Sequence, residues 1–177
     1  MVELEKLREA EPEAHRMAGY EDLFTMWQNC QARAREGKVV IKSSERGWEE
    51  ARQGVLKWFI HPMAPDCNTS HWYVFLHDIR THSGRHRHQG GLVIFVVEGK
   101  GYTIVDGKRI DWEEGDLILL PIKPQGVEHQ HFNREPGKPC KWLAFINEPF
   151  IEALGAEMQQ VETSPDWRKR EEGHEHA

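Results

Sequence analysis

Two pairs of histidines, each separated by a single residue, are the part of this sequence best suited to chemistry. His86 and His88 come shortly before the apolar run "LVIFVVEG", while His129 and His131 follow the apolar run "DLILLP" and a Pro-Gly turn. Side chains at positions i and i+2 point to the same face of a β-strand, so each pair presents two imidazoles to one side. Imidazole is a common ligand for iron, zinc and nickel. The spacing predicts a metal site built from His86, His88 and either His129 or His131.

Short β-rich runs must position these histidines. A chain of 177 residues suits one domain with terminal additions. The runs are punctuated by Gly, Pro and Asp, as in an antiparallel sandwich or barrel, which we expect over residues 38–148. They cover residues 38–42, 54–60, 72–79, 92–99, 101–107, 116–121 and 141–146.

Both ends of the chain show helical patterns. Residues 1–37 are expected to form a helical arm, since Leu23, Trp27, Cys30 and Ala34 recur at helical spacing. We expect this arm to pack on the barrel or on a second subunit. Residues 149–177 are expected to form a short helix over "PFIEALGAEMQQ" and then a polar tail that frays.

Composition excludes several classes of partner. With 23 basic and 29 acidic residues, a net charge of -6 leaves no broad cationic surface, so nucleic acid is not expected. No apolar stretch approaches the roughly 20 residues needed to span a bilayer, and the charged start does not resemble a signal peptide. We therefore expect no membrane association and a cytoplasmic location. Cys30, Cys67 and Cys140 are far apart, so reduced thiols are expected.

The two histidine stretches resemble the two motifs of the cupin superfamily. That resemblance implies a double-stranded β-helix, an all-β jelly-roll barrel, with the helical arm and the short C-terminal helix as additions. The second stretch has three more residues in its middle than the simplest form of the motif. The matching positions are His86, His88 and Gly99 in the first motif, and Gly115, Pro124, Gly126, His129 and Asn133 in the second.

One departure from the cupin pattern concerns the ligands. The motif's glutamate, which is a fourth metal ligand in many cupins, falls at Leu92. A site with three neutral histidines leaves the metal its full charge and open coordination positions. Such a site favours capture of an anionic chelating substrate, water or dioxygen.

Within the cupins, the chain resembles the gentisate and salicylate dioxygenase group through "HRH", "EGKGYTIVDG", "GDLILLP", "HQHFN" and "PCKWLAFINEPFIEAL". That resemblance implies one Fe(II) per chain held by His86, His88 and His129. It places His131 beside the substrate, where a histidine can act as acid or base. The arginine with which the group holds a substrate carboxylate falls at Ile94, so gentisate and salicylate are not the expected substrates.

Other residues receive more ordinary roles. Leu92, Ile94 and Val96 are expected to line an apolar substrate pocket. Glu128 and Gln130 alternate to the opposite face from His129 and are expected to be solvated. Structural roles are expected for a further set: Asn133 at the end of its strand, Asp106 and Gly107 in a hairpin turn, and Trp58, Trp72 and Trp142 in the core.

Three classes of function fit this pattern. The favoured one is an Fe(II) dioxygenase acting on a small oxygen-bearing substrate, either aromatic or diketone-like. A redox-neutral isomerase, lyase or hydrolase using Zn(II), Mn(II) or Ni(II) is the second, because three histidines suit zinc as well as iron. A ligand-binding cupin without turnover is the third. The expected partners are a small-molecule substrate and a second copy of the chain in a homodimer.

Overall fold

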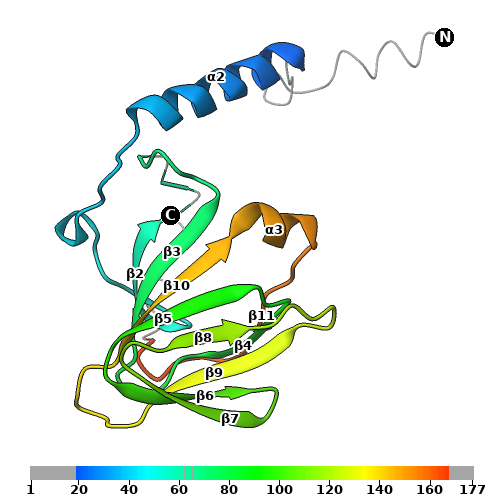
Figure 1. Ribbon diagram of the computed structural model, residues 1–177. Helices are drawn as coiled ribbons and strands as arrows, with labels where there is room; N and C mark the ends of the chain where they lie inside the picture. The colour runs from blue at the N-terminus through cyan, green and yellow to red at the C-terminus, as the bar shows by residue number, and fades with distance from the viewer. Residues whose placement is uncertain (1–18, 62, 65, 168–177) are drawn as a thin grey trace, which may run out of the picture.

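The computed structural model describes residues 19–61, 63, 64 and 66–167, and two antiparallel sheets form its centre (Figure 1). The six-stranded sheet has the order β1 (Glu49–Ala51), β2 (Gly54–Ile60), β3 (Trp72–Asp78), β10 (Lys141–Asn147), β5 (Leu92–Glu98) and β8 (Leu117–Leu120). The five-stranded sheet has the order β11 (Gln159–Glu162), β4 (Arg85–His88), β9 (Val127–Asn133), β6 (Lys100–Val105) and β7 (Lys108–Glu113). Neighbours such as β3 and β10, or β4 and β9, are far apart in sequence, as in a jelly roll. The predicted all-β barrel is confirmed.

The core lies between the two sheets. In β5 the burial of side chains alternates, so that Leu92, Ile94 and Val96 point inward while Val93 and Phe95 point outward. This period of two is the geometry of a strand with one face in a core. The inward residues of β5 pack with apolar side chains from neighbouring elements, namely Ile79, Trp112, Ile118, Leu120, Cys140, Trp142 and Ala144.

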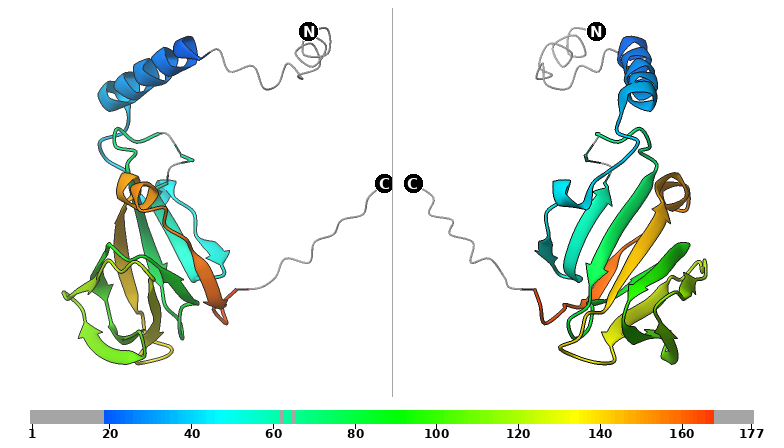
Figure 2. Two further views of the ribbon diagram at one scale, coloured as in Figure 1. Left: turned by 90° about the vertical axis from the view of Figure 1, so that its right-hand side faces the viewer. Right: turned by 60° about the vertical axis from the view of Figure 1, so that its left-hand side comes forward.

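Helix α2 (Tyr20–Glu36) confirms the helical pattern over that part of the predicted arm. It projects from the barrel in every view, and none of its residues is buried (Figures 1 and 2). Packing of the arm on its own barrel was therefore a wrong expectation for residues 20–36; packing on a second subunit stays a prediction. The first 18 residues of the predicted arm lie outside the described residues.

The run at residues 38–42 is not a strand, contrary to expectation. Lys38 makes only an isolated bridge with Cys67, and Val39 and Val40 are exposed. A short helix, η2 (Ser43–Glu45), follows. A high content of β-branched residues does not make a strand when no neighbouring edge is available for pairing.

The C-terminal part also differs from the pattern. Helix α3 (Glu148–Ala153) is shorter than predicted, and the chain continues into β11, which pairs with β4. Asn147 caps α3 by accepting a hydrogen bond from the Phe150 amide. The start of the polar tail is held in place, because the Ser164 hydroxyl donates to the His82 carbonyl at 2.9 Å. The expected fraying is therefore wrong for residues 164–167, and the rest of the tail lies outside the described residues.

Two further expectations concern the whole chain. Cys30, Cys67 and Cys140 are free thiols, as predicted. In the described part of the chain, no helix has the length and apolar character needed to cross a bilayer.

Candidate metal centre

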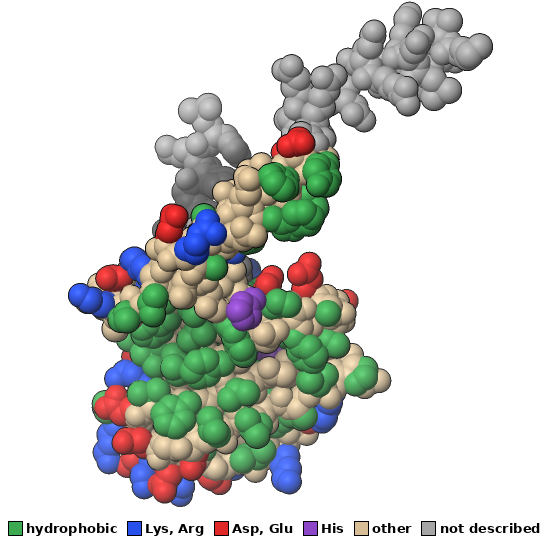
Figure 3. All heavy atoms as spheres, turned by 45° about the horizontal axis from the view of Figure 1, so that its top comes forward, with side chains coloured by type: hydrophobic (Ala, Val, Ile, Leu, Met, Phe, Trp, Pro, Cys, Tyr) green, Lys and Arg blue, Asp and Glu red, His purple; other side chains and the backbone are tan. Residues whose placement is uncertain are grey.

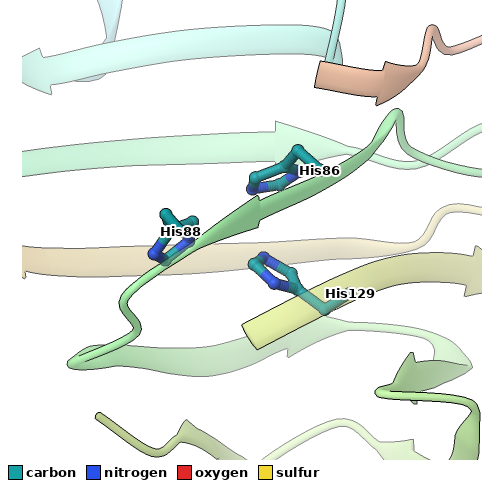
Figure 4. A group of neighbouring side chains, drawn as sticks. All are labelled: His86, His88 and His129. Atoms are coloured by element: carbon teal, nitrogen blue, oxygen red, sulfur yellow. The ribbon is translucent and has the colours of Figure 1, made fainter. Parts of the chain in front are cut away.

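Strands β4 and β9 bring three histidines together inside the barrel. His86 and His129 lie directly opposite each other in the antiparallel register, and His88 lies two residues along β4 on the same face. Figure 4 shows the three rings pointing toward one another from the two strands. One ligand atom from each ring lies within 4.8 Å of the others, and all three residues are buried. Of the two alternatives for the third ligand, His129 is the one whose ring nitrogen lies with those of His86 and His88.

The hydrogen-bond partners of these rings fit a metal. The Nδ1 of His129 lies 3.1 Å from the Val127 carbonyl, so Nδ1 carries the proton and Nε2 keeps its lone pair. That Nε2 is buried and has no hydrogen-bond partner, and the same is true of Nδ1 of His86. A buried polar atom without a partner costs about 1–3 kcal/mol, which coordination of a cation would recover. The donor set therefore fits a divalent metal.

His88 is the ligand that must adjust. Its Nδ1 accepts a hydrogen bond from the Gly90 amide at 3.0 Å, which leaves the proton on Nε2. Coordination through Nε2 would require that proton to move to Nδ1 and this hydrogen bond to open. His88 thus differs from His129, whose backbone partner already favours the ligand tautomer.

Burial keeps the three imidazoles in the neutral state. Removal from water, with a smaller contribution from the neighbouring His88, lowers the pKa of His86 to about 4. Burial also lowers the pKa of His88 and brings the pKa of His129 well below its usual value. All three imidazoles are therefore neutral at pH 7, which is the state that binds metals.

His131 lies next to this group but belongs to a second set of contacts. Its ring centre is 5.4 Å from that of His129, and its Nδ1 lies 2.7 Å from the Thr103 hydroxyl oxygen. That oxygen also accepts a hydrogen bond from Trp112 Nε1 at 2.9 Å. Because the indole can only donate, the hydroxyl proton is free to point at His131 Nδ1, and in that arrangement the imidazole proton lies on Nε2. Nε2 is buried without a hydrogen-bond partner, so in that tautomer it carries a proton that no group in the described structure accepts.

From the sequence, Thr103 and Trp112 were not singled out, Trp142 was placed in the core, and His77 was assigned no partner. Thr103 pairs with His131 across β6 and β9, and Trp112 reaches it from β7. The Trp142 ring centre lies 4.9 Å from that of His131 and 4.7 Å from that of His77, and Trp142 has a buried Nε1 without a partner. Burial lowers the pKa of His77 to about 3. A threonine at an inward position of an apolar strand was the available signal for Thr103.

Leu92, Ile94 and Val96 all point into the barrel, as the alternation predicted. They are at most 4 % exposed and belong to the apolar core cluster. Their role as the lining of a substrate pocket stays a prediction. Arg80 and Arg87, two arginines that precede these residues in the chain, have half-exposed side chains that pair with Asp78 and Glu128, so neither supplies a charge to the interior.

Several smaller expectations have clear outcomes. Asn133 is structural as predicted, since its amide donates to the carbonyls of Ile79 and Lys138. Asp106 and Gly107 form the predicted two-residue hairpin turn between β6 and β7, both at positive φ. Gln130 is buried rather than solvated, because its amide donates to the Ser83 carbonyl at 3.0 Å.

Glu128, the predicted core tryptophans and three further histidines complete the comparison with the sequence-based expectations. Glu128 is partly exposed and pairs with Arg87. Of the three tryptophans expected in the core, only Trp142 is buried, since Trp58 and Trp72 are partly exposed. His61, His71 and His82 take no part in the three-histidine group.

Comparison with known proteins gives one family match and several partial relatives. Residues 75–146 match the model of the Cupin domain family. A gentisate 1,2-dioxygenase from Streptomyces sp is 39% identical over 72 residues, which is 40% of this chain and 19% of that protein. A 5-aminosalicylate 1,2-dioxygenase from Comamonas sp is 36% identical over 74 residues, again 40% of this chain and 19% of that protein. The chain thus spans about a fifth of the length of these curated relatives.

The solved structures agree on the fold. The polyketide cyclase RemF from Streptomyces resistomycificus superposes with a TM-score of 0.53 at 18% identity, covering 73% of this chain and 89% of that one. The fold is that of a cupin, a double-stranded β-helix with short helices. Within that class, the chain resembles the gentisate and salicylate 1,2-dioxygenase group, as the sequence motifs indicated.

Proposed function

We propose that this chain is an Fe(II)-dependent dioxygenase in which His86, His88 and His129 hold one iron per chain. The observation that carries this proposal is the group of three buried imidazoles, two of which have nitrogens without a hydrogen-bond partner. The local similarity to gentisate and 5-aminosalicylate 1,2-dioxygenases supports iron over other divalent metals. A homodimer and a cytoplasmic location are part of the same proposal.

The bound iron would supply open coordination positions and the redox chemistry that dioxygen requires. The protein's own part begins with His131. Its pKa lies well below the usual histidine value because the ring is fully buried, so it is neutral at pH 7. With its proton on Nε2, it can donate a hydrogen bond to a substrate oxygen that becomes more negative during the reaction. Thr103 and Trp112 hold that tautomer in place.

The apolar interior restricts the substrate. Ile94 and Val96 are fully buried alkyl side chains, and the arginines at positions 80, 85 and 87 all pair with carboxylates on the outside. A free substrate carboxylate would be buried here without a cation, at a cost of several kcal/mol. We therefore propose a chelating substrate with a largely apolar body, either a phenol with adjacent oxygens or a diketone. Gentisate and salicylate should turn over weakly.

Oxygen uptake tests this proposal. The metal-free protein is reconstituted under anaerobic conditions with Fe(II), Mn(II), Zn(II) or Ni(II), and each form is mixed with catechols, gentisate, salicylate and β-diketones. We expect substrate-dependent oxygen consumption with Fe(II) alone, fastest with uncharged chelating substrates. Substrate conversion without oxygen uptake would instead support the redox-neutral metal enzyme, and binding without conversion would support a ligand-binding cupin.

A further inference from the structure

Helix α2 carries an apolar stripe that the barrel of its own chain does not cover. The stripe consists of Tyr20, Leu23, Phe24 and Trp27, at the spacing of one helical face, and these side chains are 42–70% exposed. Isolated helices of this length are marginal in water, because packing of the apolar face provides most helix stability in proteins. We therefore expect a partner surface to cover this stripe and stabilise the helix.

The base of α2 is firmly attached, so the helix has a defined position from which to reach that partner. The Lys38 amide donates to the Asp66 carbonyl at 2.9 Å, and the Asn68 amide donates to the Lys38 carbonyl at 3.1 Å. Gly37 fits so closely against Asn68 that a Cβ would come within 2.6 Å of its amide nitrogen. Arg46 pairs with Asp66 at 2.8 Å and fixes this segment to the barrel.

The outer face of the six-stranded sheet is a second uncovered apolar surface. It consists of Val93, Phe95 and Val97 of β5 with Leu117 and Leu119 of β8, which are 40–68% exposed. Val93 pairs with Leu119 and Phe95 with Leu117, so the five side chains form one surface. An apolar hollow of about 430 Å³ adjoins it at Val93, lined also by Ile60, Trp72, Val74 and Phe145. Figure 3 shows hydrophobic side chains gathered on the barrel and along one side of the projecting helix.

We propose that the apolar stripe of α2 lies across this outer face on a second copy of the chain, and that the second copy returns the same contact. A twofold dimer, in which each subunit supplies one stripe and one outer face, is the smallest closed arrangement that covers both uncovered surfaces of each chain. A helix of 17 residues is roughly 25 Å long, enough to cross about five strands spaced about 4.8 Å apart. The five side chains of the outer face are all uncharged, which suits an apolar helix better than a charged peptide. This inference does not depend on the reaction at the metal.

Light scattering on the full chain, with variants of each surface, tests the proposal. We expect the unmodified protein to be a dimer at micromolar concentration. The double variant Phe24→Glu with Trp27→Glu, and separately Leu119→Glu, should raise the dissociation constant at least 100-fold and yield monomers. Thr25→Glu places the same charge on the opposite side of α2 and should remain dimeric. Circular dichroism should show the same sheet signal in all four proteins, since every altered side chain is exposed.

Mixing the two kinds of monomer gives the sharpest result. The Phe24→Glu and Trp27→Glu chain keeps an intact outer face, and the Leu119→Glu chain keeps an intact stripe. A mixture can therefore form one good contact, and we expect the two to associate at least tenfold more tightly than either does with itself. A monomeric unmodified protein, a dimer that survives the stripe substitutions, or a mixture that gains no affinity would each overturn the proposal.

Discussion

The barrel interior has two walls that are buried to a similar degree but satisfied in different ways. The apolar wall is formed by β5, β8 and β10 and includes Leu92, Ile94, Ile118 and Ala144, whose burial is favourable by itself. The histidine wall is formed by the inward side chains of β4 and β9 at positions 86, 88, 129 and 131, and three of these have a buried nitrogen without a partner. The comparison shows where a ligand would stabilise the fold most. It is the place where buried polar atoms have no hydrogen-bond partner within the chain.

Lowering the pH should have the largest effect on stability, because it acts on the buried histidines and not on the apolar wall. Burial lowers the pKa of His86, in the histidine wall, to about 4, and the pKa of His77, which lies outside that wall on β3 against Trp142, to about 3, so both remain neutral in the folded protein. In the unfolded chain they take up protons as the pH falls through about 6.5, and folding then becomes less favourable. Each group removes up to about 1.4 kcal/mol per pH unit between about 6.5 and its folded pKa. Equilibrium unfolding of the metal-free protein should show several kcal/mol lost between pH 6.5 and 4.5.

The replacement His86→Gln provides the control for this pH dependence. It keeps a polar side chain but removes one titrating group, so the loss of stability with falling pH should become shallower. A stability that stays constant from pH 7 to 5 in the metal-free protein would contradict the described burial of the histidine wall.

A cavity in the apolar wall should lower the unfolding free energy without changing metal binding. Ile94→Ala removes buried methyl and methylene groups from a fully covered site, and a loss of about 2–5 kcal/mol in unfolding free energy is expected. The number of metal ions bound per folded chain should not change. Val93→Ala, one residue along on the exposed face, should cost less than about 1 kcal/mol. Metal loss in a folded Ile94→Ala protein would mean that the two walls are not separable.

Thr103 on β6 links His131 of the histidine wall to Trp112 on β7, and loss of its hydroxyl should have a smaller effect. Thr103→Val leaves Trp112 Nε1 and His131 Nδ1 without their partner, at a cost of about 1–3 kcal/mol in unfolding free energy. Metal content should remain at one per chain, while turnover of the best substrate should fall about tenfold or more because the His131 tautomer is no longer fixed. Thr103→Ser keeps the hydroxyl and should restore most of the turnover. Equal turnover in the Val and Ser variants would remove Thr103 from the mechanism.

The sequence predicted those features of the site that depend on local geometry. The period of two along a strand is enough to place His86 with His88, and the cupin motifs selected His129. The role of Thr103 depends on the register between β6 and β9, which no local pattern reveals. The prediction that Gln130 is solvated was wrong for a related reason. Alternation correctly placed its side chain on the face opposite His129, but the segment around Ser83 covers that side of β9.

The errors in the fold have the same origin. Residues 38–42 have strand-forming side chains but no strand beside them, whereas the polar segment of β11 becomes a strand because the edge of β4 is available to it. Pairing partners, rather than propensity, decided both cases. The outward direction of α2 likewise depends on contacts at residues 37, 38 and 66–68 that are distant in sequence.

Metal content of the purified protein tests the central claim most directly. Elemental analysis and a calorimetric titration with Fe(II) under anaerobic conditions should give one metal per chain for the unmodified protein and for the exposed-site control His71→Ala. His129→Ala should bind no metal, or bind it with a loss greater than the roughly 10–100-fold that removal of an outer partner costs, while its sheet signal in circular dichroism is retained. One tightly bound metal per chain in the folded His129→Ala protein would contradict the account.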